Sequence, residues 1–210
     1  MAMAALNKIT ATKAVEVCQQ VELGDRSRGK LRPESAPADF LDALIGEGLY
    51  LDAARFLAHA LPKQEAVWWA CQCARLAGGQ GLPAPASAAL TAAEAWVVDP
   101  SDEHRRAALL AAETAGIGTP AGCTALAAFL SGGSLAPKDC PEVVPASHLT
   151  GRSVAGAITI AAVQTEPEKM TDKLKSFVNN GLDIRPFRRS GLRAPSPVRS
   201  RRRPIPHRSC

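Results

Sequence analysis

The sequence predicts an all-α fold, a single antiparallel array of about seven to eight helices with a basic C-terminal tail. Three observations lead to this prediction. Alanine, the strongest helix former and a residue depleted from strands, accounts for 39 of the 210 residues. The aromatic residues that favour sheets are few (Phe 5, Trp 3, Tyr 1). Apolar residues also recur at helical spacing between short Gly- and Pro-containing connections.

The N-terminal part of the chain predicts three helices and one loop. Residues 11–20 have the pattern of a short helix. Residues 22–36 are charged and contain Gly and Pro, as loops do. A second helix begins near Pro37 and ends at Gly46, and a third covers about residues 49–60. In these two helices the apolar side chains share one face, which we expect to lie in the core.

Two helices are expected in the middle of the chain. The first has Pro62 in its first turn and ends at Gly78. Trp69 anchors its predicted buried stripe, and Leu76 lies on the same stripe about two turns later. A Gly-, Pro- and Ser-rich connection precedes the second, which covers residues 86–97.

Two further helices are predicted from a capping residue followed by proline. These starts are Asp99-Pro100 and Thr119-Pro120, in which the first residue is the expected N-cap and proline is the first helical residue. Gly116 is expected to end the first of these helices.

The last part of the predicted domain is a long loop followed by two helices. Residues 131–147 contain three prolines and two glycines, and connections of this length often carry function. Helices are expected over residues 149–164 and 167–180, with Gly181 as the residue that follows the second helix.

Charge divides the chain into a helical domain, residues 1–182, and an Arg/Pro-rich tail, residues 183–210, which its composition predicts to be disordered. The domain has 16 basic and 19 acidic residues, whereas the tail has nine arginines and only Asp183 as an acid. The tail is therefore expected to bind polyanions such as nucleic acid weakly at most, or to add little as an accidental reading-frame extension. Its candidate polyanion-binding residues are Arg188, Arg189, Arg201, Arg202 and Arg203.

The six cysteines and the N-terminus indicate a cytoplasmic protein. The start of the chain lacks the pattern of a secretory signal, so the thiols are expected to be reduced. No apolar run approaches the roughly 18 residues that a membrane span needs. Cys71 and Cys73 are two residues apart and point to different sides of a helix, so they predict buried thiols rather than a metal site. We expect neither a metal nor a cofactor.

No motif identifies a catalytic residue. The sequence contains no phosphate-binding loop and no nucleophile elbow. The glycines between Gly116 and Gly122 lack the strand that a dinucleotide-binding motif requires. Asp139, Cys140 and His148 could together form a thiol nucleophile and its base. A small-molecule enzyme with a site in residues 131–148 is therefore the alternative to a binding protein.

Two surfaces are candidates for binding a protein partner. Trp68 lies among polar residues, on the helical face that also carries Gln72 and Arg75, and Trp and Arg are enriched at binding hot spots. The alternative is that a neighbouring helix covers this face. The second candidate is the beginning of the long loop, at Gly132, Gly133 and Ser134.

The segment LAHALPKQEAVWWAC carries a resemblance to a known family. It is similar to an uncharacterised bacterial domain-of-unknown-function family with an LAHALPxxEAVWWAC core, and the resemblance extends from about residue 12 to Ile184. Members of that family often occur near type VI secretion genes. The resemblance implies no activity, but it implies an accessory role. We therefore expect a non-enzymatic adaptor or chaperone whose partner is a secretion-system component or effector.

Overall fold

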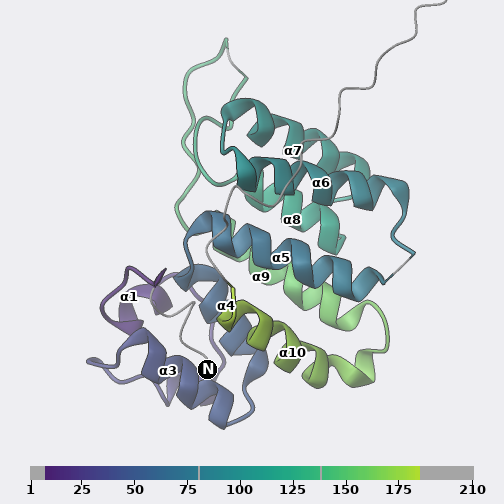
Figure 1. Cartoon of the computed structure of the whole chain (residues 1–210). Helices are drawn as coiled ribbons and strands as arrows, with labels where there is room; N and C mark the ends of the chain where they lie inside the picture. The colour runs from purple at the N-terminus through teal and green to yellow at the C-terminus, as the bar shows by residue number, and fades with distance from the viewer. Residues whose placement is uncertain (1–7, 80, 138, 185–210) are drawn as a thin grey trace, which may run out of the picture.

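The computed structural model describes residues 8–79, 81–137 and 139–184, and these form an all-α array (Figure 1). No strand occurs within these ranges. The longer helices are connected by short segments, apart from the loop that precedes α9. The α-helices are α1 (Ala14–Cys18), α2 (Asp25–Arg28), α3 (Pro37–Gly46), α4 (Tyr50–Ala60), α5 (Lys63–Gly78), α6 (Ala84–Val98), α7 (Asp102–Ala115), α8 (Pro120–Phe129), α9 (Leu149–Val163) and α10 (Met170–Leu182). A short 3-10 helix, η2 (Pro167–Lys169), precedes α10.

Helices α8 and α9 lie at the centre of the array. Helix α8 packs against α5, α6, α7 and α9, whereas α9 packs against α4, α5, α8 and α10. Helices α6 and α7 form the upper part of the view in Figure 1, and α3 and α10 form the lower part. The chain therefore builds one continuous layered body rather than two separate bundles.

Alanine fills the interfaces between the central helices. Small side chains allow helix axes to approach closely, toward the lower end of the roughly 8–10 Å range. The buried alanines of α8 and α9 are Ala121, Ala125, Ala127, Ala128, Ala155, Ala157, Ala161 and Ala162. The alanine content that predicted the helices therefore also determines how they pack.

Trp69 is the largest fully buried side chain among the described residues, and its position on the helix predicts this burial. It is fully buried, and its indole Nε1 donates a hydrogen bond to the carbonyl oxygen of Phe177 at 2.8 Å. Gly181 lies inside α10, which continues to Leu182, so the prediction that Gly181 follows the helix is wrong. A Cβ at Gly181 would lie 2.7 Å from atoms of both Leu57 and Trp69, so this glycine serves close packing rather than helix termination.

Three other details differ from the predictions. The prediction that Asp99 is the N-cap of α7 is wrong, because Asp99 and Pro100 form the turn after α6. Ser101 is the N-cap instead, and its hydroxyl oxygen accepts a hydrogen bond from the backbone N–H of His104. Leu76 lies on the predicted buried stripe but is 59% exposed. It belongs to the last turn of α5, where a side chain is buried only if a neighbouring helix extends far enough to cover it. Helix α2 forms within the segment expected to be a loop.

Other helix starts and core residues agree with the sequence. Thr119 caps α8 by accepting from the backbone of Gly122, with Pro120 as the first helical residue. Ala14 and Val17 of α1 are buried. Among the helices that the structure describes, none has both the length and the apolar character that crossing a bilayer requires.

The predicted tail lies almost entirely outside the described residues. Its five candidate polyanion-binding residues, Arg188, Arg189, Arg201, Arg202 and Arg203, are among those that the structure does not describe. Ile184, which lies in the predicted tail, is only 4% exposed. Its carbonyl oxygen accepts a hydrogen bond from Lys8 Nζ at 3.1 Å, so the packed body extends at least two residues beyond the predicted boundary.

Candidate functional site

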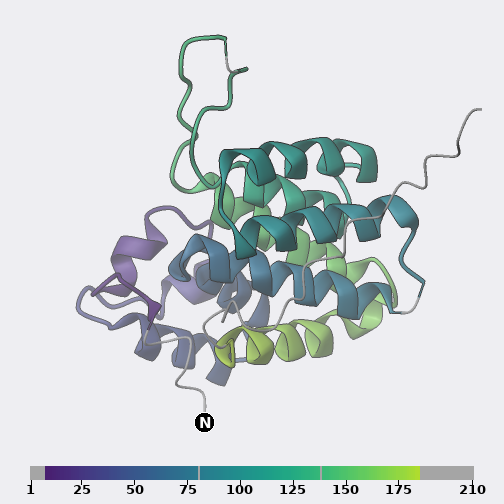
Figure 2. The ribbon, with the colours of Figure 1, turned by 45° about the horizontal axis from the view of Figure 1, so that its top comes forward.

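The loop between α8 and α9, described over residues 131–137 and 139–148, projects from the helical body (Figure 2). Side chains from α5 and α9 hold its first residues. Lys63 Nζ donates to the Ser131 carbonyl oxygen at 2.7 Å, and Thr150 Oγ1 donates to the Leu130 carbonyl oxygen at 3.0 Å. The beginning of the loop is therefore fixed to the body, close to the start of α9.

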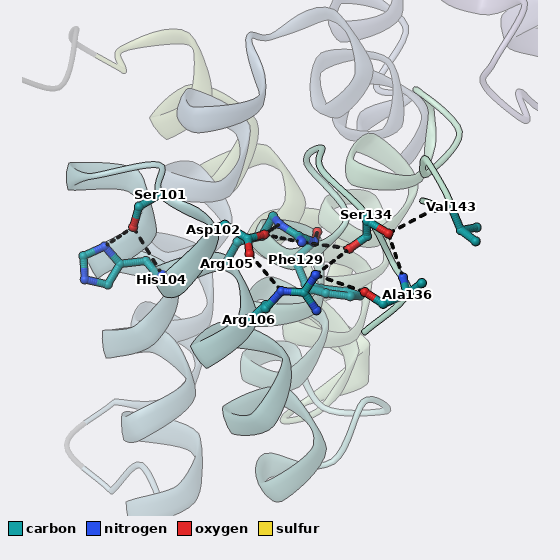
Figure 3. Close-up of polar contacts among 9 residues, drawn as sticks. All are labelled: Ser101, Asp102, His104, Arg105, Arg106, Phe129, Ser134, Ala136 and Val143. Carbon is teal, nitrogen blue, oxygen red and sulfur yellow. Dashed lines mark hydrogen bonds and ion pairs between the residues drawn. The ribbon is translucent and has the colours of Figure 1, made fainter. Parts of the chain in front are cut away.

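Arg105 of α7 is the main anchor of the loop (Figure 3). Its side chain is 4% exposed, and its guanidinium donates to the carbonyl oxygens of Phe129 at 3.0 Å and Ser134 at 2.8 Å. The guanidinium carbon also lies 4.7 Å from the centre of the Phe129 ring, within the range of a cation–π interaction. One buried cation thus joins the end of α8 to the beginning of the loop.

Asp102, at the start of α7, positions two arginines at once. Its Oδ1 accepts from Arg105 Nε at 3.0 Å, and its Oδ2 accepts from Arg106 Nε at 2.9 Å. Hydrogen bonds from Arg105 and then Arg106 lower the pKa of the Asp102 carboxyl. Arg106 Nη2 in turn donates to the Ala136 carbonyl oxygen at 3.0 Å. The start of α7 therefore holds two successive points of the loop backbone.

Ser134 closes the loop upon itself. Its hydroxyl oxygen accepts from the backbone N–H groups of Ala136 and Val143, both at 3.1 Å. The backbone N–H of Leu135 donates to the Val143 carbonyl oxygen at 2.8 Å. Two stretches of the loop nine residues apart are thereby brought together in a defined conformation.

The backbone conformation and the closeness of Arg105 both require a glycine at position 133. Its φ of 63° lies in the left-handed region that favours glycine, and a Cβ there would lie 3.0 Å from Arg105 Nε. Gly132, by contrast, has open space around its added Cβ. Of the three predicted loop residues, Gly133 and Ser134 thus shape the loop directly. Whether any of them contacts a partner stays a prediction.

The loop presents two apolar side chains that the sequence analysis did not single out. Val143 is 52% exposed and Val144 is 69% exposed. They stand, after Glu142, between Pro141 and Pro145. Two adjacent β-branched residues between prolines are the sequence feature that could have identified this exposed apolar site. Exposed apolar groups on an ordered loop are a feature of protein-binding surfaces.

The Trp68 face of α5 packs against α6. Arg75 forms a two-point ion pair with Glu94 of α6, at 2.7 and 2.9 Å, which raises the pKa of Arg75. Gln64, one turn before Trp68, donates to the Val97 carbonyl oxygen at 3.0 Å. Trp68 is half-buried and packs against the core, and Gln72 is also half-buried. The structure therefore favours coverage by a neighbouring helix, and only part of this face remains accessible.

The residues considered for catalysis lie at two places in the connection between α8 and α9. Asp139 and Cys140 are exposed in the loop, whereas His148 is the residue that precedes α9. Burial raises the pKa of the Cys71 and Cys73 thiols, as expected for buried apolar groups rather than nucleophiles. Within the described ranges, no group of three or more His, Cys, Asp or Glu residues is arranged to hold a metal ion.

Ser101, His104 and Asp99 form a second arrangement that superficially resembles a catalytic triad. Both partners contact the same imidazole atom, His104 Nδ1, at 3.1 Å from the serine hydroxyl and 3.3 Å from the aspartate carboxylate. A triad needs the serine and the aspartate on opposite ring nitrogens. This cluster therefore caps α7 and does not activate the serine.

Comparison with known proteins gives one match. A family model described as "Family of unknown function (DUF6931)" matches residues 40–185, which is more than half of the chain. The match includes the Trp68 face, the complete loop and its anchoring arginines, and it begins later than the resemblance that the sequence suggested. No curated protein and no solved structure matches the chain.

Proposed function

We propose that this chain, which belongs to the family of unknown function DUF6931, is a non-enzymatic cytoplasmic protein that binds another protein through its anchored loop. The partner would be a component or effector of a bacterial secretion system, with the chain acting as an adaptor or chaperone. The observation that carries the proposal is the loop of residues 131–148, which exposes two valines and is held by a buried arginine.

The energetic argument concerns the order of the loop before binding. Ordering a flexible segment on association opposes binding, by about 0.5–1.5 kcal/mol for each long side chain that is immobilised. Here Arg105, Arg106 and Ser134 already hold the loop backbone through hydrogen bonds. A partner that covers Val143 and Val144 therefore gains apolar burial with little further ordering of this chain.

The test is co-purification from the native host with variants of the exposed valines. We expect Val143→Ser combined with Val144→Ser to lose a partner that the wild-type chain retains, because serine removes the apolar contact. Leu110→Ser is the matched control, because Leu110 is a 67% exposed apolar residue on α7. Recovery of the same partners by all three folded proteins would refute binding through the loop.

A second arm tests the Trp68 face. Trp68→Ala should lower recovery of the partner only if the accessible part of this ring takes part in binding, and its folding is checked by circular dichroism. If the valine variant and Trp68→Ala each lose the same partner, the interface includes both surfaces. If Trp68→Ala is folded and keeps every partner, the Trp68 prediction is wrong and the loop alone carries the interface.

A further inference from the structure

A cleft of about 280 Å³ opens on the side of the molecule where α4 and α9 meet the segment that follows α1. It is separate from the valine pair and has a different chemical character, because charged and polar side chains form much of its wall. The polar lining residues are Gln20, Glu22, Arg55, His59, Arg152 and Thr159.

Two arginines from neighbouring helices border this cleft. Arg55 of α4 donates to Asp52 Oδ1 at 3.1 Å and to the Glu22 carbonyl oxygen at 3.4 Å, so its guanidinium is held in place. Arg152 of α9 donates to the Glu22 carboxylate at 2.6 Å. The side chains of Arg152 and Glu22 are 63% and 83% exposed, so solvent weakens this pair and the carboxylate can be displaced.

His59 provides a neutral imidazole between the two helices. Burial, with smaller contributions from His148 and Arg152, lowers the pKa of His59 to about 4, so the ring is uncharged at neutral pH. Gly151 of α9 makes room for the ring, because a Cβ there would lie 2.8 Å from imidazole atoms. A neutral imidazole has one N–H donor and one acceptor nitrogen.

Gly156 leaves part of the cleft wall without a side chain. It lies in the middle of α9, where glycine disfavours the helix, yet an added Cβ would meet nothing within 4 Å. Close helix packing, which explains Gly151 and Gly181, therefore does not explain Gly156. It lines the cleft, and a side chain at this position would enter the space available to a ligand.

We propose that this cleft binds the oxyanion group of a small molecule, a phosphate or a carboxylate, with Arg55 and Arg152 as cationic donors and His59 as an N–H donor. The Glu22 carboxylate occupies the Arg152 donors when no ligand is present, and the oxyanion replaces it. Gly156 leaves space for the remainder of the ligand. No described residue of the loop lines this cleft, although Gln20 Nε2 donates to Ser147 Oγ at 3.4 Å near the end of the loop. The two proposals are tested with different variants, so either can fail without the other.

The test is thermal unfolding of the full chain with inorganic phosphate and, in a separate series, with citrate, at constant ionic strength maintained with chloride. At about 10 mM ligand and a Kd of about 1 mM, the folding constant should rise roughly tenfold, an increase in Tm of about 3–6 °C. The two series distinguish phosphate from carboxylate as the preferred group. No stabilisation beyond that given by chloride in either series would overturn the proposal.

Three variants locate the site. Arg152→Gln should weaken binding at least tenfold through loss of a charged donor, and Glu22→Gln should strengthen it because the competing carboxylate is removed. Gly156→Ala should raise the Tm without ligand, since alanine favours the helix, but abolish the response to the anion. Gly46→Ala is the matched control, because Gly46 also lies in a helix with open space around its added Cβ.

The variants also give the result that would contradict the site. An unchanged anion response in Arg152→Gln or in Gly156→Ala would show that any stabilisation arises elsewhere on the surface. Weaker binding in Glu22→Gln would exclude Glu22 as a competitor of the anion. NMR titration of His59 supplies a further readout, because a bound oxyanion should raise the pKa of this imidazole toward its ordinary value.

Discussion

Replacement of Arg105 by alanine should destabilise the protein strongly and release the loop of residues 131–148. In the folded chain the Arg105 guanidinium satisfies the carbonyl oxygens of Phe129 and Ser134 and lies over the Phe129 ring. Alanine leaves both carbonyls without this donor in a site where the arginine side chain is only 4% exposed.

The expected loss of stability can be estimated from these contacts. A buried acceptor that loses its partner costs about 1–3 kcal/mol, and the cation–π contact adds about 1 kcal/mol. Two such carbonyls and the cation–π contact sum to about 3–7 kcal/mol. Because Arg106 Nη2 also donates to the Ser134 carbonyl at 3.4 Å, the free energy of unfolding should fall by the lower part of this range, about 3–5 kcal/mol, which corresponds to a decrease in Tm of about 6–20 °C for a chain of this size. Arg105→Lys should recover less than half of the loss, because an ammonium group cannot reproduce the fork of donors.

Urea unfolding and hydrogen exchange together measure this effect. Arg106→Ala is the comparison, because Arg106 contacts the same Asp102 and also donates to the loop at Ala136, but it is 27% exposed, so its loss should be smaller, about 1–2 kcal/mol. In Arg105→Ala the backbone N–H of Val143, which donates to Ser134, should exchange faster than in Arg106→Ala. If Arg105→Ala is no less stable than Arg106→Ala, or if exchange at Val143 is unchanged, the assignment of Arg105 as the anchor is wrong.

Three other predictions concern the core and the pH dependence of stability. Gly181→Ala should lower stability by about 1–3 kcal/mol in urea unfolding, despite the better helix propensity of alanine, because the added Cβ overlaps Leu57 and Trp69; a more stable variant would contradict the packing role. Trp69→Phe should lose about 1–3 kcal/mol as the Phe177 carbonyl loses its donor, and equal stability would exclude a role for this hydrogen bond. Between pH 6.5 and about 4 the unfolded chain protonates at His59 while the folded chain does not, so stability decreases as the pH falls through this window. In His59→Gln the decrease in the free energy of unfolding between pH 6.5 and 4 should be smaller by about 1–2 kcal/mol, a figure reduced because solvent partly screens the ring. An identical pH profile in wild type and variant would contradict the low pKa of His59.

The helices were predictable because their determinants are local. Capping chemistry predicts the start of α8 at Thr119, and helical periodicity predicts the burial of Trp69. Both can be determined from residues that are close together in the sequence. Leu76 shows the limit of this reasoning, because periodicity gives the direction of a side chain but not the reach of the neighbouring helix. The role of Gly181 depended on contacts with residues more than 100 positions away, which periodicity does not reveal.

The candidate surfaces were less predictable than the helices. Gly133 and Ser134 were identified within the loop, but Arg105, which holds them, lies on a different helix and looks like an ordinary charged residue in the sequence. The prediction that Trp68 binds a partner rests on the polarity of its neighbours on the same helical face. Two of those neighbours, Gln64 and Arg75, bond to α6. A charged or polar side chain indicates a solvent-exposed helical face only when no element distant in the sequence provides its hydrogen-bond partner.

The alanine-rich interfaces of α8 and α9 have a consequence for the response of the protein to temperature. An interface of methyl groups removes less apolar surface from water per residue than one of leucines, and the heat-capacity change of unfolding grows with that surface. The change per residue should therefore fall below the usual value of about 12–15 cal/mol/K, which gives a flatter curve of stability against temperature. Alanine also loses no side-chain rotamer entropy on burial, so this core offsets its smaller hydrophobic gain with a smaller entropic cost.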